Sequence, residues 1–112
     1  MRALVVSQDP EEAAVLSFVL QRAGMTVSRT RDLSSTVEGR DFEKYGFIIL
    51  VLPEAQQVAT VRRLRAHTQA PLIVIGERLD ESVQVLLLDS GADLFVLRPF
   101  SSRLLVAQIK AL

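Results

Sequence analysis

Few acidic residues could hold a metal at the edge of the predicted sheet where its strands end: Asp9, Glu54 and Glu77. Magnesium needs hard oxygen ligands, typically carboxylates together with retained waters. Asp9 is better explained as the cap of a helix that begins at Pro10, because an Asp side chain accepts hydrogen bonds from the first backbone N–H groups. The sequence therefore predicts no metal site and no cofactor.

A phosphoryl-transfer site also needs an oxygen nucleophile in line with a metal-neutralised phosphate. The apolar run Phe47–Pro53 contains no polar side chain, and Val51 near its end offers no such oxygen. Ser7 is an alternative acceptor, but nothing nearby in the sequence supplies a base or a metal. We interpret Ser7 as a small polar residue that fills space, and we expect no enzyme activity.

Each basic residue of interest allows two interpretations. Arg98 could bind an anion, or it could form an ion pair with Glu77 or Asp9, and we favour the internal partner. His67 is the only histidine and could carry a phosphoryl group, but it lies at a predicted helix end, where a cation suits the helix dipole. A solvated helix face is the default interpretation of the basic cluster Arg62, Arg63 and Arg65.

The elements that must position these residues alternate along the chain. The predicted strands are Ala3–Val6, Met25–Arg29, Phe47–Pro53, Pro71–Ile75 and Leu94–Leu97. The predicted helices are Pro10 to the closing Gly24, a short helix within Leu33–Tyr45, then Glu54–Thr68, Glu81–Ser90 and Ser101–Leu112. The middle strand is apolar on both faces and needs helices over both. This alternation predicts an α/β fold, a doubly wound five-stranded parallel sheet flanked by five helices.

Length and composition limit the possible functions. The 112 residues suffice for one domain, and 13 basic residues balance 13 acidic ones, so strong nonspecific nucleic-acid binding is not expected. The absence of cysteine excludes disulfides and thiolate chemistry, and no glycine-rich nucleotide motif occurs. No signal peptide is visible, and no apolar run approaches the ~20 residues of a membrane helix, so we expect a cytoplasmic domain.

With this order of elements, the whole chain resembles the receiver domain of bacterial two-component response regulators. Residues 91–100, Gly-Ala-Asp-Leu-Phe-Val-Leu-Arg-Pro-Phe, are similar to the family's Gly-Ala-Asp…Lys-Pro-Phe signature, and the tail 99–112 resembles OmpR/PhoB-type transcription factors. Further matching segments are Ala3–Pro10, Tyr45–Pro53 and Pro71–Gly76. The resemblance implies a flavodoxin-like, CheY-like sheet with strand order 2-1-3-4-5.

The chain departs from the family at all five functional positions. Ser7 and Gln8 stand where the family has two magnesium-binding acids, and Val51 stands where it has the phosphorylated Asp. Gly76 replaces the switch Ser or Thr, and Arg98 replaces a Lys. The family's phosphorylation chemistry is therefore not expected here.

Two further positions follow from the resemblance. Counting back from Pro53 without a gap would place Ile49, rather than Val51, at the acceptor position, and neither side chain can accept a phosphoryl group. Phe95 falls at the family's switch aromatic. With no phosphate and no Ser or Thr to move, we expect packing to lock Phe95 in one rotamer.

These features lead to one functional hypothesis and two alternatives. Residues 1–112 are interpreted as a phosphorylation-independent pseudo-receiver, a regulatory and dimerisation module of a response regulator. It would control transcription through a downstream winged-helix DNA-binding domain, and so act on DNA indirectly. The alternatives are a stand-alone pseudo-receiver that serves as a protein-interaction adaptor, and a small-ligand binder that uses the vacated phosphorylation pocket.

The resemblance also implies a homodimer interface. OmpR/PhoB-type receivers pair through their fourth helix, fifth strand and fifth helix, around an apolar patch with ion pairs. Here Leu94 stands where the family often has a second Asp, Leu104 where it often has Glu, and Gln108 where it often has Arg, while Lys110 keeps a charge. We expect added leucines to favour association without phosphate; the alternative is that Leu104 packs into the core.

Overall fold

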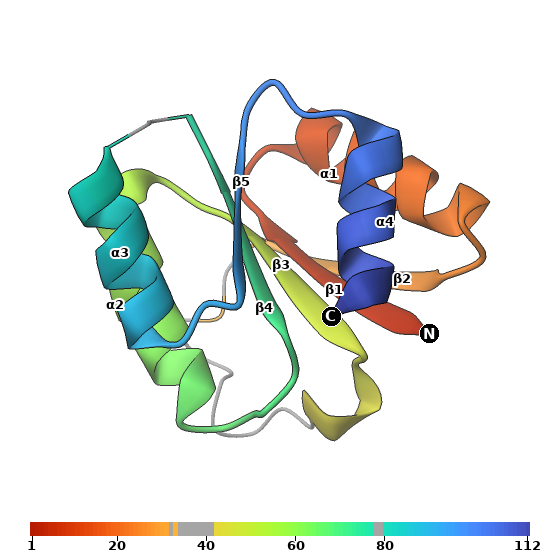
Figure 1. Ribbon diagram of the computed structural model, residues 1–112. Helices are drawn as coiled ribbons and strands as arrows, with labels where there is room; N and C mark the ends of the chain where they lie inside the picture. Colours follow the sequence, from red (N-terminus) through yellow and green to blue (C-terminus); the bar gives the residue numbers. More distant parts are fainter. Residues whose placement is uncertain (32, 34–41, 78–79) are drawn as a thin grey trace.

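The computed structural model is a five-stranded parallel sheet with helices on both faces (Figure 1). It describes residues 1–31, 33, 42–77 and 80–112. The strands are β1 (Arg2–Ser7), β2 (Thr26–Thr30), β3 (Phe47–Val51), β4 (Leu72–Gly76) and β5 (Leu94–Leu97). Their order is β2-β1-β3-β4-β5 and every neighbouring pair is parallel, so the strand order expected from the resemblance is confirmed.

The described residues form four α-helices, one fewer than the sequence predicts. They are α1 (Pro10–Arg22), α2 (Glu54–Arg65), α3 (Glu81–Ser90) and α4 (Ser102–Ala111). In Figure 1, α1 and α4 lie on one face of the sheet, and α2 and α3 lie on the other. The predicted fourth and fifth helices are thus α3 and α4.

The remaining predicted helix, within Leu33–Tyr45, falls mostly outside the described residues. Its described end is a single 3-10 turn, η1 (Phe42–Lys44). The backbone N–H of Tyr45 bonds the carbonyl of Phe42, and that of Gly46 bonds the carbonyl of Arg2 at 2.7 Å. The chain therefore passes from η1 directly into β3.

The middle strand explains why both faces of the sheet are covered. All five residues of β3 are buried. Successive side chains of a strand point to opposite faces. Ile48 and Leu50 join the core formed with α2 and α3, whereas Phe47, Ile49 and Val51 join the core formed with α1 and α4. The uninterrupted apolar run thus contributes side chains to both hydrophobic cores.

The helix starts follow from local capping. The Asp9 carboxylate accepts hydrogen bonds from the backbone N–H groups of Glu11 (2.9 Å) and Glu12 (3.4 Å), so its predicted role as a cap is confirmed. Asp80 caps α3 in the same way, and the Ser101 hydroxyl caps α4. Each cap fixes where the chain turns from the carboxyl end of a strand into a helix.

Arg65 links the end of α2 to the segments that precede β4 and β5, so the interpretation of the basic cluster as a solvated face is wrong for this residue. Its guanidinium donates to the carbonyls of Gly91, Thr68 and Ala70 and to the Asp93 carboxylate, which lies 2.9 Å away. Asp93 also accepts from the backbone N–H of Leu72 at 2.8 Å. The Gly-Ala-Asp segment before β5 therefore has a structural role, because its hydrogen bonds hold it to α2 and to the start of β4.

Candidate functional site

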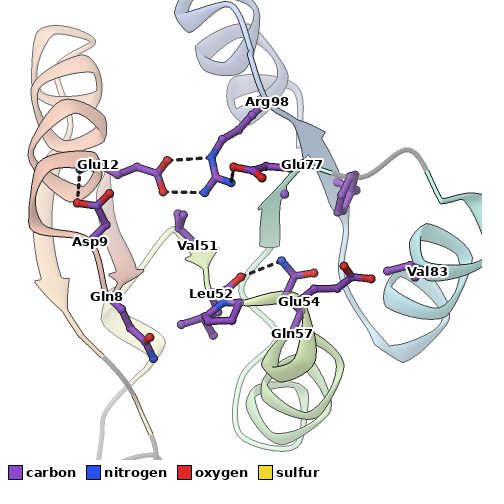
Figure 2. A pocket seen from close by; sticks show the side chains of 13 residues that line it. Gln8, Asp9, Glu12, Val51, Leu52, Glu54, Gln57, Glu77, Val83 and Arg98 are labelled. Atoms are coloured by element: carbon purple, nitrogen blue, oxygen red, sulfur yellow. Dashed lines mark hydrogen bonds and ion pairs between the residues drawn. The ribbon is translucent and has the colours of Figure 1, made fainter.

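The carboxyl ends of the strands bring the five predicted site positions to one edge of the sheet. Ser7 pairs with Val51 in the register of β1 and β3, Gly76 ends β4, and Arg98 follows β5. A pocket of about 530 Å³ opens at this edge (Figure 2). The pocket is lined by Gln8, Asp9, Glu12, Val51, Leu52, Pro53, Glu54, Gln57, Gly76, Glu77, Val83, Phe95 and Arg98.

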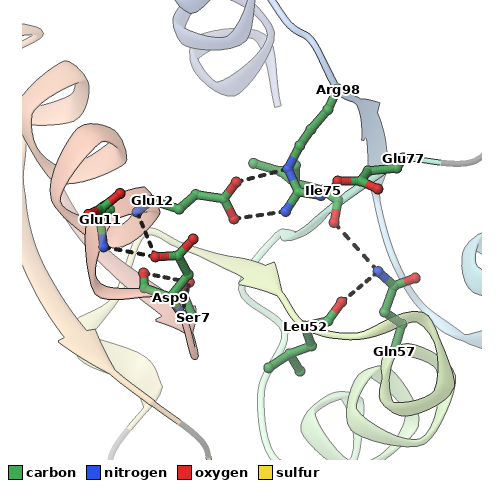
Figure 3. A network of polar contacts seen from close by, with 9 residues as sticks. All are labelled: Ser7, Asp9, Glu11, Glu12, Leu52, Gln57, Ile75, Glu77 and Arg98. Atoms are coloured by element: carbon green, nitrogen blue, oxygen red, sulfur yellow. Dashed lines mark hydrogen bonds and ion pairs between the residues drawn. The ribbon is translucent and has the colours of Figure 1, made fainter.

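Arg98 reaches across the pocket to carboxylates from two other elements (Figure 3). Its Nε and Nη2 donate to the two carboxylate oxygens of Glu12 at 2.8 and 2.7 Å, and its Nη1 donates to Glu77 at 3.2 Å. A bidentate pair such as that of Arg98 and Glu12 combines charge attraction with a fixed geometry. The expected pairing with Glu77 is confirmed, and the pairing with Asp9 is wrong because Asp9 caps α1.

The ion triad of Glu12, Glu77 and Arg98 defines the electrostatics of the pocket. Two carboxylates surround one guanidinium, so the triad carries a formal charge of −1. The Glu12 and Arg98 side chains are 25% and 28% exposed, whereas that of Glu77 is 75% exposed. The pair with Glu12 is thus the better shielded from solvent, and Arg98 is engaged by the protein's own acids.

Removing the charge of Glu12 tests the energetic contribution of this pair. We expect Glu12→Gln to lower the free energy of unfolding by about 1–2 kcal/mol, because Arg98 loses a charge-assisted, bidentate partner. Glu11→Gln is the matched control, since Glu11 lies in the same first turn and is exposed. Urea denaturation of both variants measures the difference, and equal stability of the two would contradict a structural role for the pair.

Ser7 is buried beside the pocket and is engaged locally. Its hydroxyl donates to the Asp9 carbonyl at 3.2 Å and accepts from the Asp9 backbone N–H at 3.1 Å. Both bonds lie within the turn that joins β1 to α1. The side chain is therefore a local link in this turn, and it does not appear among the lining residues of the pocket.

Val51 and Gly76 line the pocket but place no polar side-chain group in it. Val51 ends β3, is 5% exposed and lines the pocket. A Cβ atom at Gly76 would lie 3.1 Å from Cζ of the Phe95 ring, closer than ordinary contact. The ring thus packs over the place that a side chain at position 76 would need. Ile49, the other candidate for the acceptor position, is fully buried within the sheet.

Gln57 is a site residue that the sequence analysis missed. It is 3% exposed on α2, and its side-chain nitrogen Nε2 donates to the carbonyls of Leu52 (3.0 Å) and Ile75 (3.5 Å). Because both neighbouring groups are hydrogen-bond acceptors, the end of the Gln57 amide that faces them must be the NH₂ group. The only sequence signal was a polar residue on a helix of otherwise ordinary pattern, which does not reveal these partners.

The predicted dimer-interface residues lie along one edge of the molecule. In Figure 1, β5 is the edge strand, with α3 on one side and α4 on the other. Leu104 is 57% exposed, so the alternative that it packs into the core is wrong. Leu94 and Gln108 are half-buried and Lys110 is exposed. Exposed apolar side chains on α3 are Val85, Leu86 and Leu88.

The described part of the chain has neither a cluster of metal-binding side chains nor a helix suited to crossing a membrane. Among the described residues, no group of three or more His, Cys, Asp or Glu side chains is arranged to hold a metal ion. None of the helices in the described part of the chain is both long and apolar enough to cross a membrane. The features that the pocket does present are its ion triad, its apolar surfaces and Gln57.

Comparison with known proteins assigns the family. The family profile described as "Response regulator receiver domain" matches residues 3–110, and the chain belongs to this family. It is 32% identical to the DNA-binding response regulator MtrA of Mycolicibacterium smegmatis, over 98% of this chain and 49% of MtrA. It is 29% identical to the transcriptional regulatory protein SrrA of Staphylococcus aureus, over 97% of this chain and 46% of SrrA.

A solved structure supports the same fold. A two-component response regulator from Clostridium difficile superposes with a TM-score of 0.88 at 19% identity, covering 99% of this chain and 93% of that one. The chain spans about half the length of the curated relatives it matches. It is thus a receiver domain of two-component signalling whose homologues are transcriptional regulators, and the predicted resemblance to OmpR/PhoB-type regulators fits them.

Proposed function

We propose that this domain is a pseudo-receiver, a receiver that works without phosphorylation. The observation that carries the proposal is Val51, a buried apolar residue at the end of the middle strand, where phosphoryl transfer would need an oxygen nucleophile. Ser7 and Gln8, at the end of β1, supply no carboxylate for magnesium. The domain is then a regulatory module and not an enzyme.

The ion triad and the Phe95 ring support the same proposal. Arg98 is held by Glu12 and Glu77, so it needs no phosphoryl group as a counterion. Phe95 packs over Gly76, and no side chain at position 76 competes for that space. Internal contacts thus stabilise one arrangement of the pocket, in keeping with the expected single rotamer of Phe95.

We further propose that the domain forms a two-fold homodimer through α3, β5 and α4, and that it positions an effector domain. Leu104 and the exposed leucines of α3 give this face an apolar patch. MtrA is a DNA-binding protein and is about twice the length of this chain. A winged-helix DNA-binding domain that follows α4 is therefore the proposed effector, with DNA as its indirect partner.

Treatment with a phosphodonor tests the central part of this proposal. After incubation with acetyl phosphate and magnesium, we expect the intact mass of the protein to stay unchanged, because Val51 offers no acceptor oxygen. Beryllium fluoride with magnesium should likewise leave the backbone amide spectrum unchanged. A mass increase of one phosphoryl group on an aspartate would overturn the proposal, and mapping by peptide mass spectrometry would locate it.

A further inference from the structure

The pocket beside the ion triad is large enough for a small molecule. Its volume of about 530 Å³ lies in the usual range of ligand sites, roughly 300–1,000 Å³. Apolar walls come from Val51, Leu52, Val83 and Phe95. In Figure 2 the ion triad lies on one side of Val51, and the polar side chains of Gln57 and Glu54 lie on the other side, beside Leu52. A ligand that fits both surfaces needs an apolar body and a polar head.

Gln57 indicates what the polar head must offer. Both hydrogen bonds of its amide are made by Nε2, which donates to the carbonyls of Leu52 and Ile75. Among the described residues, its carbonyl oxygen Oε1 accepts no hydrogen bond, and Figure 3 shows this oxygen directed away from both carbonyls. A buried acceptor is unfavourable unless a donor reaches it. The ligand should therefore donate an N–H or O–H to Gln57.

The charges that line the pocket favour a cation. Asp9, Glu12 and Glu77 supply three carboxylates against the single guanidinium of Arg98, an excess of two negative charges even with Glu54 set aside. Arg98 is already engaged by two of these carboxylates, so it offers little to an anion. The same excess attracts a positive head group and repels a carboxylate or phosphate.

We propose that this pocket binds a small organic ammonium compound with an apolar body. Its N–H groups would donate to Oε1 of Gln57, and the carboxylate of Glu77 would balance its charge. Its apolar body would lie against the apolar walls of the pocket, which include Val83 and Phe95. The proposal rests on the function proposed above, since a phosphorylated, metal-loaded pocket would present a different charge.

Three probes of similar shape and different charge test the proposal: benzylammonium, benzyl alcohol and benzoate. Each is titrated into the ¹⁵N-labelled protein while amide spectra are recorded. We expect benzylammonium to cause saturable shifts at Gly76, Glu77 and the Gln57 side-chain NH₂. Benzyl alcohol should bind at least about tenfold more weakly and benzoate should not bind. Equal affinities for all three, or no saturable shift with benzylammonium, would overturn the proposal.

Two variants locate the binding. Val83→Trp should abolish the shifts by filling the pocket, whereas Val15→Trp, at an exposed position of α1 outside the pocket, should bind like the wild type. Gln57→Leu removes the acceptor and should weaken benzylammonium more than benzyl alcohol. Binding that survives Val83→Trp would place the site elsewhere and overturn the proposal. The acetyl phosphate experiment separately decides the pseudo-receiver function, so the two failures are distinguishable.

Discussion

Val51→Asp is expected to destabilise the domain by about 3 kcal/mol instead of restoring a phosphorylation site. The new carboxylate would lie at a position that is 5% exposed, at the end of a fully buried strand. Arg98 is already bound to Glu12 and Glu77, and Ser7 and Gln8 offer no acid that would recruit magnesium. A buried charge without a partner is the costly case.

Urea denaturation of Val51→Asp and Val51→Thr separates charge from shape. Threonine keeps the branched shape of valine and adds only a hydroxyl group, so we expect it to lose less than half as much stability. Burial raises the pKa of a carboxyl group, so the part of the penalty that is due to charge should be present at neutral pH and should disappear as the pH falls below the unfolded pKa of about 3.9. A stable Val51→Asp protein that takes up phosphate from acetyl phosphate would contradict this account.

Leu104→Glu is expected to weaken the proposed homodimer by at least about 100-fold. Burying one leucine side chain contributes roughly 1.5–3 kcal/mol, and a two-fold interface buries the same leucine twice. Two such contributions of about 1.5 kcal/mol correspond to a factor of about 100 in the dissociation constant. Exposed ion pairs contribute little, so the charges this face lacks should matter less than its leucines.

Sedimentation equilibrium with a matched control checks this prediction. Leu104 suits the test better than Leu94, because Leu94 is half-buried against the core and its replacement would also affect folding. Val15→Glu places the same charge at an exposed apolar position of α1 and should leave the dimer intact. If Leu104→Glu dimerises as well as the wild type, or if Val15→Glu is equally impaired, the interface does not lie on α3, β5 and α4.

The features that could be predicted from the sequence are those that depend on short local patterns, namely the middle strand and the start of α1. The apolar run Phe47–Pro53 identified the middle strand, because only a strand covered on both faces tolerates such a run. Asp9 followed by Pro10 identified the start of α1 from capping chemistry alone. The strand order came from the family resemblance rather than from these patterns, since alternation of strands and helices does not fix which strands are neighbours.

The missed features depend on groups that are far apart in the chain. Glu12 and Arg98 are 86 residues apart, and their pairing requires β1 and β5 to be placed around the same pocket. Gln57 and Arg65 find backbone carbonyls as partners, and carbonyls carry no sequence signal. In the sequence alone, Glu12 is an ordinary acidic residue near a helix start, and Arg65 belongs to a basic cluster that is interpreted by default as a solvated helix face.

The most direct test of the account is sedimentation equilibrium of the unmodified domain with and without acetyl phosphate and magnesium. We expect a homodimer in both conditions with the same dissociation constant, because the proposed pseudo-receiver pairs through α3, β5 and α4 without phosphorylation. A protein that stays monomeric at high micromolar concentration until the phosphodonor is added would contradict it.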